Sequence, residues 1–222
     1  MKSNIEILLK KSFFELQKLI CKEENSSRIV IPCYRGKGDR YSEQELKQVF
    51  LCLLEKESDF TFSVETPTEN VYRFSDKDKD TPKFSKTPKK GYRSAQIDVS
   101  VYSGDIKNHI EFKYGQVESN VFPIEKDLLK MIAEEGETNY FVHYLVTKND
   151  SPETRDALSK KIRSAVENID GKQKSETDSG KIDNYEDKKK RVFVISQVII
   201  RDEKKVYENI FNLSNVGQNK YV

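Results

Sequence analysis

Apolar residues recur along this chain with two spacings, one typical of helices and the other typical of strands. Spacings of three and four residues predict helices over 5–22, 42–56, 123–135 and 152–169. Alternating or continuous apolar runs predict strands over 60–64, 95–102, 108–114, 140–147 and 191–201. A short apolar run over 29–33 is compatible with either a strand or an extended link.

Local signals mark where two of these helices begin. Ser42 opens the sequence Ser-Glu-Gln-Glu, a capping box in which the Ser42 and Glu45 side chains satisfy exposed backbone amides of the first turn. Pro123 suits the first turn of its helix, where a missing N–H group costs nothing. Both signals support a helix start at the predicted position.

Two segments show no periodicity. Residues 66–93 contain three prolines and predict a long loop or insertion, which in compact domains is usually functional or disordered. Residues 170–190 are rich in Lys, Asp, Ser and Gly and predict a mobile loop. Three strands in sequence, then a helix and a further strand, imply a mixed β-sheet flanked by helices, so we expect an α/β fold. The length of 222 residues suits a single domain over 1–222.

Composition narrows the class of protein. The 39 basic and 37 acidic residues leave a net charge of +2, too small to indicate nucleic-acid binding by itself. No apolar run approaches the roughly 20 residues that cross a bilayer, and the first residues lack the apolar core of a secretory signal, so we expect a cytoplasmic protein. Cys21, Cys33 and Cys52 form no C-x-x-C pair and are expected to be reduced apolar fillers. With only two histidines, His109 and His143, carboxylates and lysines must carry any chemistry.

Two acids and a lysine stand out in the predicted strands 95–102 and 108–114. A two-residue turn at Gly104 and Asp105 joins the strands, since Gly suits the first position of a type II′ turn. This register places Asp98 opposite Glu111, with Lys113 on the same face.

Opposed like charges destabilise a hairpin, and two carboxylates 4 Å apart repel by about 4 kcal/mol at an effective dielectric of 20. A Mg²⁺ ion bridging Asp98 and Glu111 would compensate, and Lys113 would supply further positive charge. Such a group can orient a phosphate and activate water. Glu45, at the inner edge of the helix 42–56, is either a fourth member or simply the capping residue. Asp98 and Glu111 are otherwise solvated polar residues of an ordinary sheet.

Asp98, a 12-residue spacer and Glu111-Phe112-Lys113 resemble the motif of the PD-(D/E)XK nuclease superfamily, with Ile97 in place of the proline. The resemblance covers about residues 42–147 and implies a restriction-endonuclease-like αβββαβ core. An N-terminal helical extension (1–41) and a C-terminal helix, mobile loop and strand (148–222) would be additions. It implies Asp98, Glu111 and Glu45 as ligands of Mg²⁺ or Mn²⁺, and Lys113 as the catalytic lysine.

The expected function is therefore metal-dependent hydrolysis of phosphodiester bonds in DNA, in bacterial defence, restriction or repair. The alternatives are an inactive nuclease-like module that binds nucleic acid or a protein partner, and a scaffold for oligomer assembly. Cutting both strands of a duplex would suit a homodimer. Basic residues before the 95–102 strand, together with Gln116, are expected to contact nucleic acid: Lys83, Lys86, Lys89, Lys90 and Arg93. Lys126 and Lys130, one helical turn apart, are expected to flank the same cleft.

Overall fold

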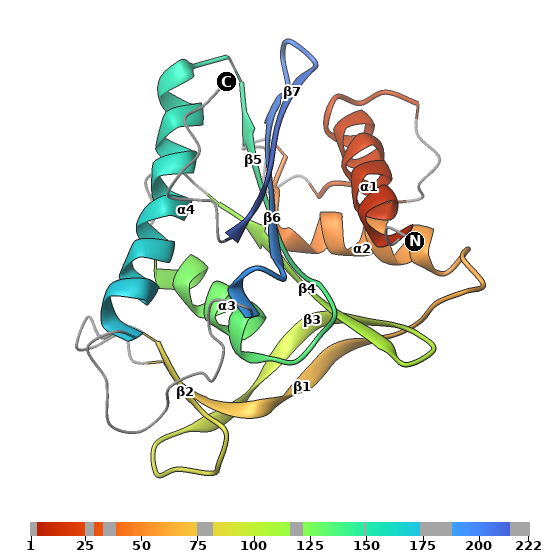
Figure 1. Ribbon diagram of the computed structural model, residues 1–222. Helices are drawn as coiled ribbons and strands as arrows, with labels where there is room; N and C mark the ends of the chain where they lie inside the picture. The colour runs from red at the N-terminus through yellow and green to blue at the C-terminus, as the bar shows by residue number, and fades with distance from the viewer. Residues whose placement is uncertain are drawn as a thin grey trace.

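A seven-stranded sheet forms the centre of the computed structural model (Figure 1). The structure describes residues 4–24, 29–32, 39–74, 82–115, 122–148, 150–173 and 188–213. The strands are β1 (Thr61–Arg73), β2 (Lys83–Ser85), β3 (Arg93–Ser103), β4 (Ile106–Tyr114), β5 (Asn139–Thr147), β6 (Val192–Ile200) and β7 (Lys205–Asn212). Their order in the sheet is β2-β1-β3-β4-β5-β6-β7.

The sheet is mixed, because β5 runs parallel to both of its neighbours, β4 and β6, whereas the remaining pairs are antiparallel. Parallel neighbours need a crossover connection, and here the crossovers contain helices. The helix α3 (Phe122–Ala133) connects β4 to β5, and α4 (Pro152–Gln173) lies between β5 and β6. The predicted class, an α/β fold with a mixed sheet flanked by helices, is confirmed.

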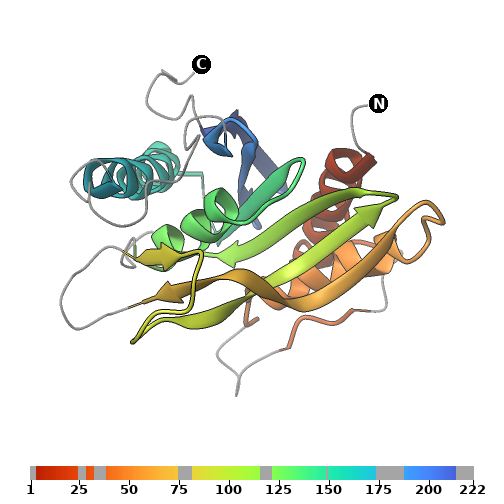
Figure 2. The same cartoon turned by 60° about the horizontal axis from the view of Figure 1, so that its bottom comes forward.

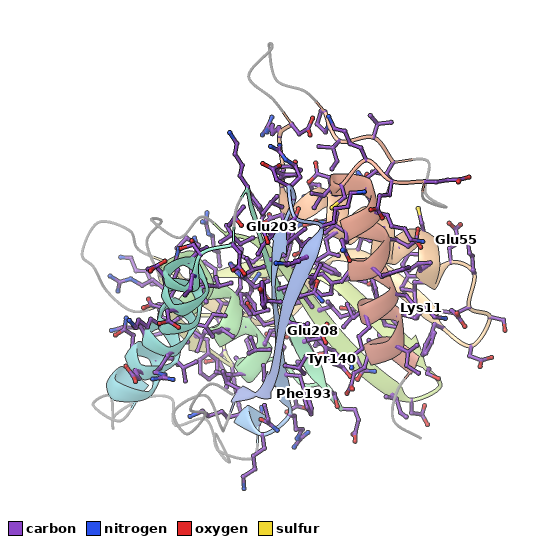
Figure 3. All side chains as sticks on the ribbon, turned by 90° about the horizontal axis from the view of Figure 1, so that it is seen from above. Lys11, Glu55, Tyr140, Phe193, Glu203 and Glu208 are labelled. Carbon is purple, nitrogen blue, oxygen red and sulfur yellow. The ribbon has the colours of Figure 1, made fainter. Side chains whose placement is uncertain are left out.

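Helices cover both faces of the sheet. The helices α1 (Asn4–Ile20) and α2 (Glu43–Leu54) pack on one face, and α3 and α4 on the other (Figure 1). Seen from above, α1 and α4 lie on opposite sides of β6 and β7 (Figure 3). The buried residues form one large apolar cluster on each side, with Phe50 and Phe112 in the first and Leu128 and Phe141 in the second.

The predicted helices and five predicted strands are present, with slightly different ends except for β1, which extends nine residues beyond the predicted 60–64. The capping box is also confirmed: the Ser42 hydroxyl accepts a hydrogen bond from the Gln44 amide, and Glu45 accepts one from the Ser42 amide. The apolar run at 29–33 is no strand where it is described, over residues 29–32. Of the predicted mobile loop 170–190, the first residues extend α4 to Gln173, and 174–187 lie outside the described residues.

The long loop predicted over 66–93 is wrong in its first part. The strand β1 continues to Arg73 and pairs with β3 on one side and with the short β2 on the other. Figure 2 shows β1, β3 and β4 as long neighbouring strands, with β2 at the end nearest α3. The ladder between β1 and β3 shifts register between Pro67 and Val71, which accommodates the proline within the strand.

A carboxylate directly after α3 stabilises this polar part of β1. Buried Glu134 accepts hydrogen bonds from the Glu69 amide at 2.8 Å, from the Asn70 amide at 3.1 Å and from the Tyr72 hydroxyl at 2.7 Å. The Asn70 side-chain amide donates a further bond to the same carboxylate at 2.9 Å. Polar residues therefore enter the strand because a carboxylate far along the chain satisfies them.

The strand β7 was not predicted, and it pairs antiparallel with β6 at the edge of the sheet. No helix in the described part of the chain is both long and apolar enough to cross a membrane.

Candidate active site

A cavity of about 570 Å³ opens where α2, α3 and the strands β1, β3 and β4 meet. Its wall combines acidic and basic side chains with few apolar ones. The charged residues that line it are Glu43, Glu65, Arg93, Asp98, Glu111, Lys113, Lys126, Asp127 and Lys130. The motif residues Asp98, Glu111 and Lys113 thus share one cavity, and Lys126 and Lys130 flank it as their spacing predicts.

The β3–β4 ladder ends at the edge of this cavity. Val99 pairs with Ile110 and Ser100 with His109, in the predicted register. The ladder stops there, one residue before Asp98 and Glu111 would face each other. Instead, the Phe112 amide donates a hydrogen bond to Asp98 Oδ2 at 2.8 Å. The two acids therefore lie where the strands no longer pair regularly, which leaves room for other groups.

Asp98 has a lysine partner from α2. Lys47 Nζ lies 3.0 Å from Asp98 Oδ1 and 2.6 Å from Glu65 Oε1. Burial would lower the pKa of Lys47, but hydrogen bonds and charge from Glu65 and Asp98 outweigh it and raise the pKa. Lys47 is thus a fixed cation that neutralises part of the negative charge at Asp98.

Glu111 has a lysine partner from α3. Its side chain is buried, and Lys130 Nζ lies 2.5 Å from Glu111 Oε1 and 3.0 Å from the Gln96 carbonyl oxygen. Burial and the negative charges of Asp127 and Asp98 raise the pKa of Glu111 well above its usual value, although Lys130 acts in the opposite direction. Burial thus favours the uncharged form of Glu111, and the contact with Lys130 favours the charged form.

Lys113 is held between two acids. Its Nζ lies 3.0 Å from Asp127 Oδ2 and 3.6 Å from Glu43 Oε2. Burial would lower the pKa of Lys113, but Asp127 and Glu43 outweigh it and raise the pKa. The amine is therefore protonated at neutral pH in this state and acts as a positive charge beside the cavity.

The structure places Glu45 away from the cavity wall. Its Oε2 accepts hydrogen bonds of 2.7 Å from both the amide and the hydroxyl of Ser42, so the carboxylate serves as the helix cap. Glu43, two residues earlier, faces the cavity instead. Burial raises the pKa of Glu43, and Lys113 partly offsets this. Of the two acids in this turn, Glu43 lines the cavity, and Glu45 has the capping role that the sequence offered as one of its two roles.

The residues present fit a hard divalent cation. Among the described residues, no group of three or more His, Cys, Asp or Glu side chains is arranged to hold a metal ion. Mg²⁺ needs fewer, since it is commonly bound by one or two carboxylates and keeps several waters. Asp98 and Glu111 supply two carboxylates that line the same cavity.

The backbone at Glu65 is strained beside this site. Glu65 has a φ of 49°, a left-handed conformation that side-chain-bearing residues seldom adopt. Such strain persists only where surrounding contacts enforce it, and it is concentrated at functional sites. The salt bridge from Lys47 to Glu65 is one such contact.

The predicted nucleic-acid-binding residues are only partly gathered at the cavity. Arg93 lines it, whereas Lys86, Lys89 and Lys90 are exposed in the connection between β2 and β3. Lys83 lies in β2, and Gln116 falls outside the described residues. Lys89 Nζ lies 5.5 Å from the centre of the Tyr92 ring, a distance typical of a cation–π contact.

Sequence reasoning missed four charged residues of the site: Glu43, Lys47, Glu65 and Asp127. Lys47 and Asp127 adjoin apolar residues of their helices, Leu46 and Leu128, which are fully buried. A charged residue next to the buried apolar face of a helix indicates a partner of opposite charge nearby, and the sequence shows this pattern at both positions. Comparison with family models, with curated proteins and with solved structures gave no match.

Proposed function

We propose that this protein is a nuclease that hydrolyses phosphodiester bonds in DNA and depends on Mg²⁺ or Mn²⁺. The observation that carries the proposal is the meeting of Asp98, Glu111 and Lys113 from two neighbouring strands at one open cavity. The resemblance of these residues to the PD-(D/E)XK motif supports the same reaction. A reducing cytoplasm suits a chain with free cysteines.

The carboxylates of Asp98 and Glu111 would hold the cation. When bound, the ion supplies charge that polarises a phosphate and lowers the pKa of water. Lys113 provides a protonated amine next to the reacting phosphate, where it stabilises negative charge. Asp127 and Glu43 orient this amine through the contacts described above.

The backbone of DNA would be bound by the basic connection before β3. Arg93 at the cavity and exposed Lys86, Lys89 and Lys90 form a positively charged path without an acidic side chain between them. Contacts of lysine and arginine with phosphates give affinity without sequence information, and the affinity falls steeply with salt.

The experiment is a cleavage assay with plasmid and linear DNA in the presence of Mg²⁺, Mn²⁺ or EDTA. We expect cleavage by the purified protein with either metal, and its loss in Asp98→Ala, Glu111→Ala and Lys113→Ala. Glu45→Gln, which alters the cap outside the cavity, should keep metal-dependent cleavage when assayed at a temperature where it is folded. Cleavage that survives in all three motif variants would refute the proposal.

A second candidate is a nuclease-like module that binds nucleic acid without cutting it. The observation that favours it is that each acid already has a lysine partner, Lys47 for Asp98 and Lys130 for Glu111. In that case Asp98→Ala would leave DNA binding intact, whereas replacing Lys86, Lys89 and Lys90 by glutamine would weaken it. A gel-shift titration at low salt measures both.

A further inference from the structure

Lys130 is enclosed by oxygen atoms from three different elements. Its Nζ lies 2.5 Å from Glu111 Oε1 on β4, 3.0 Å from the Gln96 carbonyl oxygen on β3 and 3.1 Å from Asp127 Oδ1 on α3. The residue is only 8% exposed, although it lines the cavity. Two carboxylates and a backbone carbonyl are also the kinds of ligand that a hard divalent cation prefers.

We propose that, in the metal-free protein, the Lys130 amine occupies the cation position on Glu111, and that a divalent ion must displace it to bind. The inference rests on the proposed function, because it concerns the same two carboxylates. It adds a residue that sets the metal affinity of the site, outside the Asp98, Glu111 and Lys113 motif.

Asp127 provides the place to which the displaced amine moves. Asp127 and Lys130 are three residues apart on α3, so their side chains lie on the same face of the helix. The amine can leave Glu111 and Gln96 while it keeps its contact with Asp127. The exchange thus replaces one positive charge on Glu111 by another and leaves no buried acid without a counter-charge.

The displaced amine would remain beside the cavity, where it can meet a phosphate group of the substrate. Asp127 also binds Lys113 through its other oxygen. Movement of Lys130 toward Asp127 therefore changes the charge that holds the motif lysine. Metal binding and the position of Lys113 are linked through this one carboxylate.

The first test measures Mn²⁺ binding by isothermal titration calorimetry with wild type, Lys130→Gln and Lys126→Gln. Lys126 lies on the same helix and lines the same cavity, but its amine lies over the Phe74 ring at 5.3 Å, so its replacement is a control for the loss of a positive charge at this cavity. In Lys130→Gln the charged amine no longer competes with the metal for Glu111, so we expect Mn²⁺ to bind about tenfold more tightly or better. The Lys126→Gln variant should change by less than about threefold, as expected for a partly exposed charge.

The second test uses the wild-type protein and so does not depend on the folding of a variant. Surface lysines are acetylated briefly with and without saturating Mn²⁺, and each site is quantified by mass spectrometry. We expect modification of Lys130 to rise several-fold with Mn²⁺, whereas Lys126 should change little. Lys130 that stays protected in the metal-bound protein would overturn the inference.

The results separate the inference from the proposed function. If wild type binds Mn²⁺ but Lys130→Gln binds it no more tightly than Lys126→Gln does, the displacement is refuted and the metal-dependent function stands. If neither wild type nor Lys130→Gln binds Mn²⁺, the metal-dependent function and the inference are both refuted.

Discussion

Near its turn, the β3–β4 hairpin is a regular ladder in which Ser100 and His109 face each other and share a neutral hydrogen bond of 2.8 Å. Two residues further from the turn, the ladder has ended, and Asp98 and Glu111 each bind a lysine from a different helix. The same two strands therefore carry a neutral, self-contained pair and a charged pair that depends on α2 and α3. The carboxylates of Asp98 and Glu111 lie beyond the end of the ladder, where lysines from α2 and α3 reach them.

The largest expected difference between the two pairs is in DNA cleavage. Glu111→Gln keeps the size of the side chain but removes a charge that would hold the cation, so we expect cleavage to fall by about a hundredfold or more. Ser100→Ala alters the neighbouring pair and should leave the rate within about twofold when the protein is folded. Single-turnover kinetics with Mg²⁺ measure both, and equal losses would show that the two pairs do not differ in function.

The next effect is on the pH dependence of stability. Burial, with help from the positive charge of Lys107, lowers the pKa of His109 to about 4, whereas an unfolded histidine titrates near 6.5. Between these values the unfolded chain binds a proton that the folded one does not, so His109 makes stability fall as pH falls from about 6.5 to 4.

Replacing His109 by glutamine should remove about 1.4 kcal/mol per pH unit from this slope. Urea unfolding between pH 4 and 7 measures the slope for the variant and for the wild type. The raised pKa of Glu111 and the lowered pKa of His143 also make stability depend on pH, but they do so in both proteins, so the difference between the two slopes reports His109. Parallel curves for the two proteins would contradict the expectation.

The smallest expected effect is on the free energy of unfolding at neutral pH. The two pairs should differ in how this effect depends on the salt concentration. Lys47→Met leaves Asp98 and Glu65 without their shared cation and should cost about 1–2 kcal/mol, between the values for exposed and buried ion pairs. Ser100→Ala leaves a buried ring nitrogen without its partner and should cost about 1–2 kcal/mol.

In 1 M salt the loss in Lys47→Met should shrink, since Glu65 is half exposed and its charge is screened. The loss in Ser100→Ala should stay constant, because the hydrogen bond is buried and neutral. Chemical denaturation at low and high salt distinguishes the two, and equal salt dependence would argue against a charge-held site.

Local pattern was sufficient for the helices, for the central strands and for the register of the hairpin. It was insufficient for β1 beyond Val64, because the polar residues there are held by Glu134, which is more than 60 residues away. It also failed for β7, whose apolar residues occur in adjacent pairs, Val206 with Tyr207 and Ile210 with Phe211, rather than alternating. That strand forms because it pairs with β6 along its whole length.

The candidate site shows the same limit. The spacing of Asp98, Glu111 and Lys113 located the cavity, since strand geometry alone puts them together. Their partners Lys47 and Asp127 come from helices whose position relative to the sheet is a property of the whole fold. The sequence left two roles open for Glu45, because the capping signal and the inner face of α2 coincide in one helical turn. In the structure its carboxylate accepts hydrogen bonds from Ser42.

The four hydrogen bonds of Glu134 join the residue that follows α3 to the last third of β1. Moving these elements apart would break several of the bonds together inside the protein, which is costly. Nearer the start of the same strand, Lys47 of α2 forms a salt bridge with Glu65. The strand β1 is therefore fastened at separate points to polar groups from both helical layers, so its position relative to the cavity depends on both.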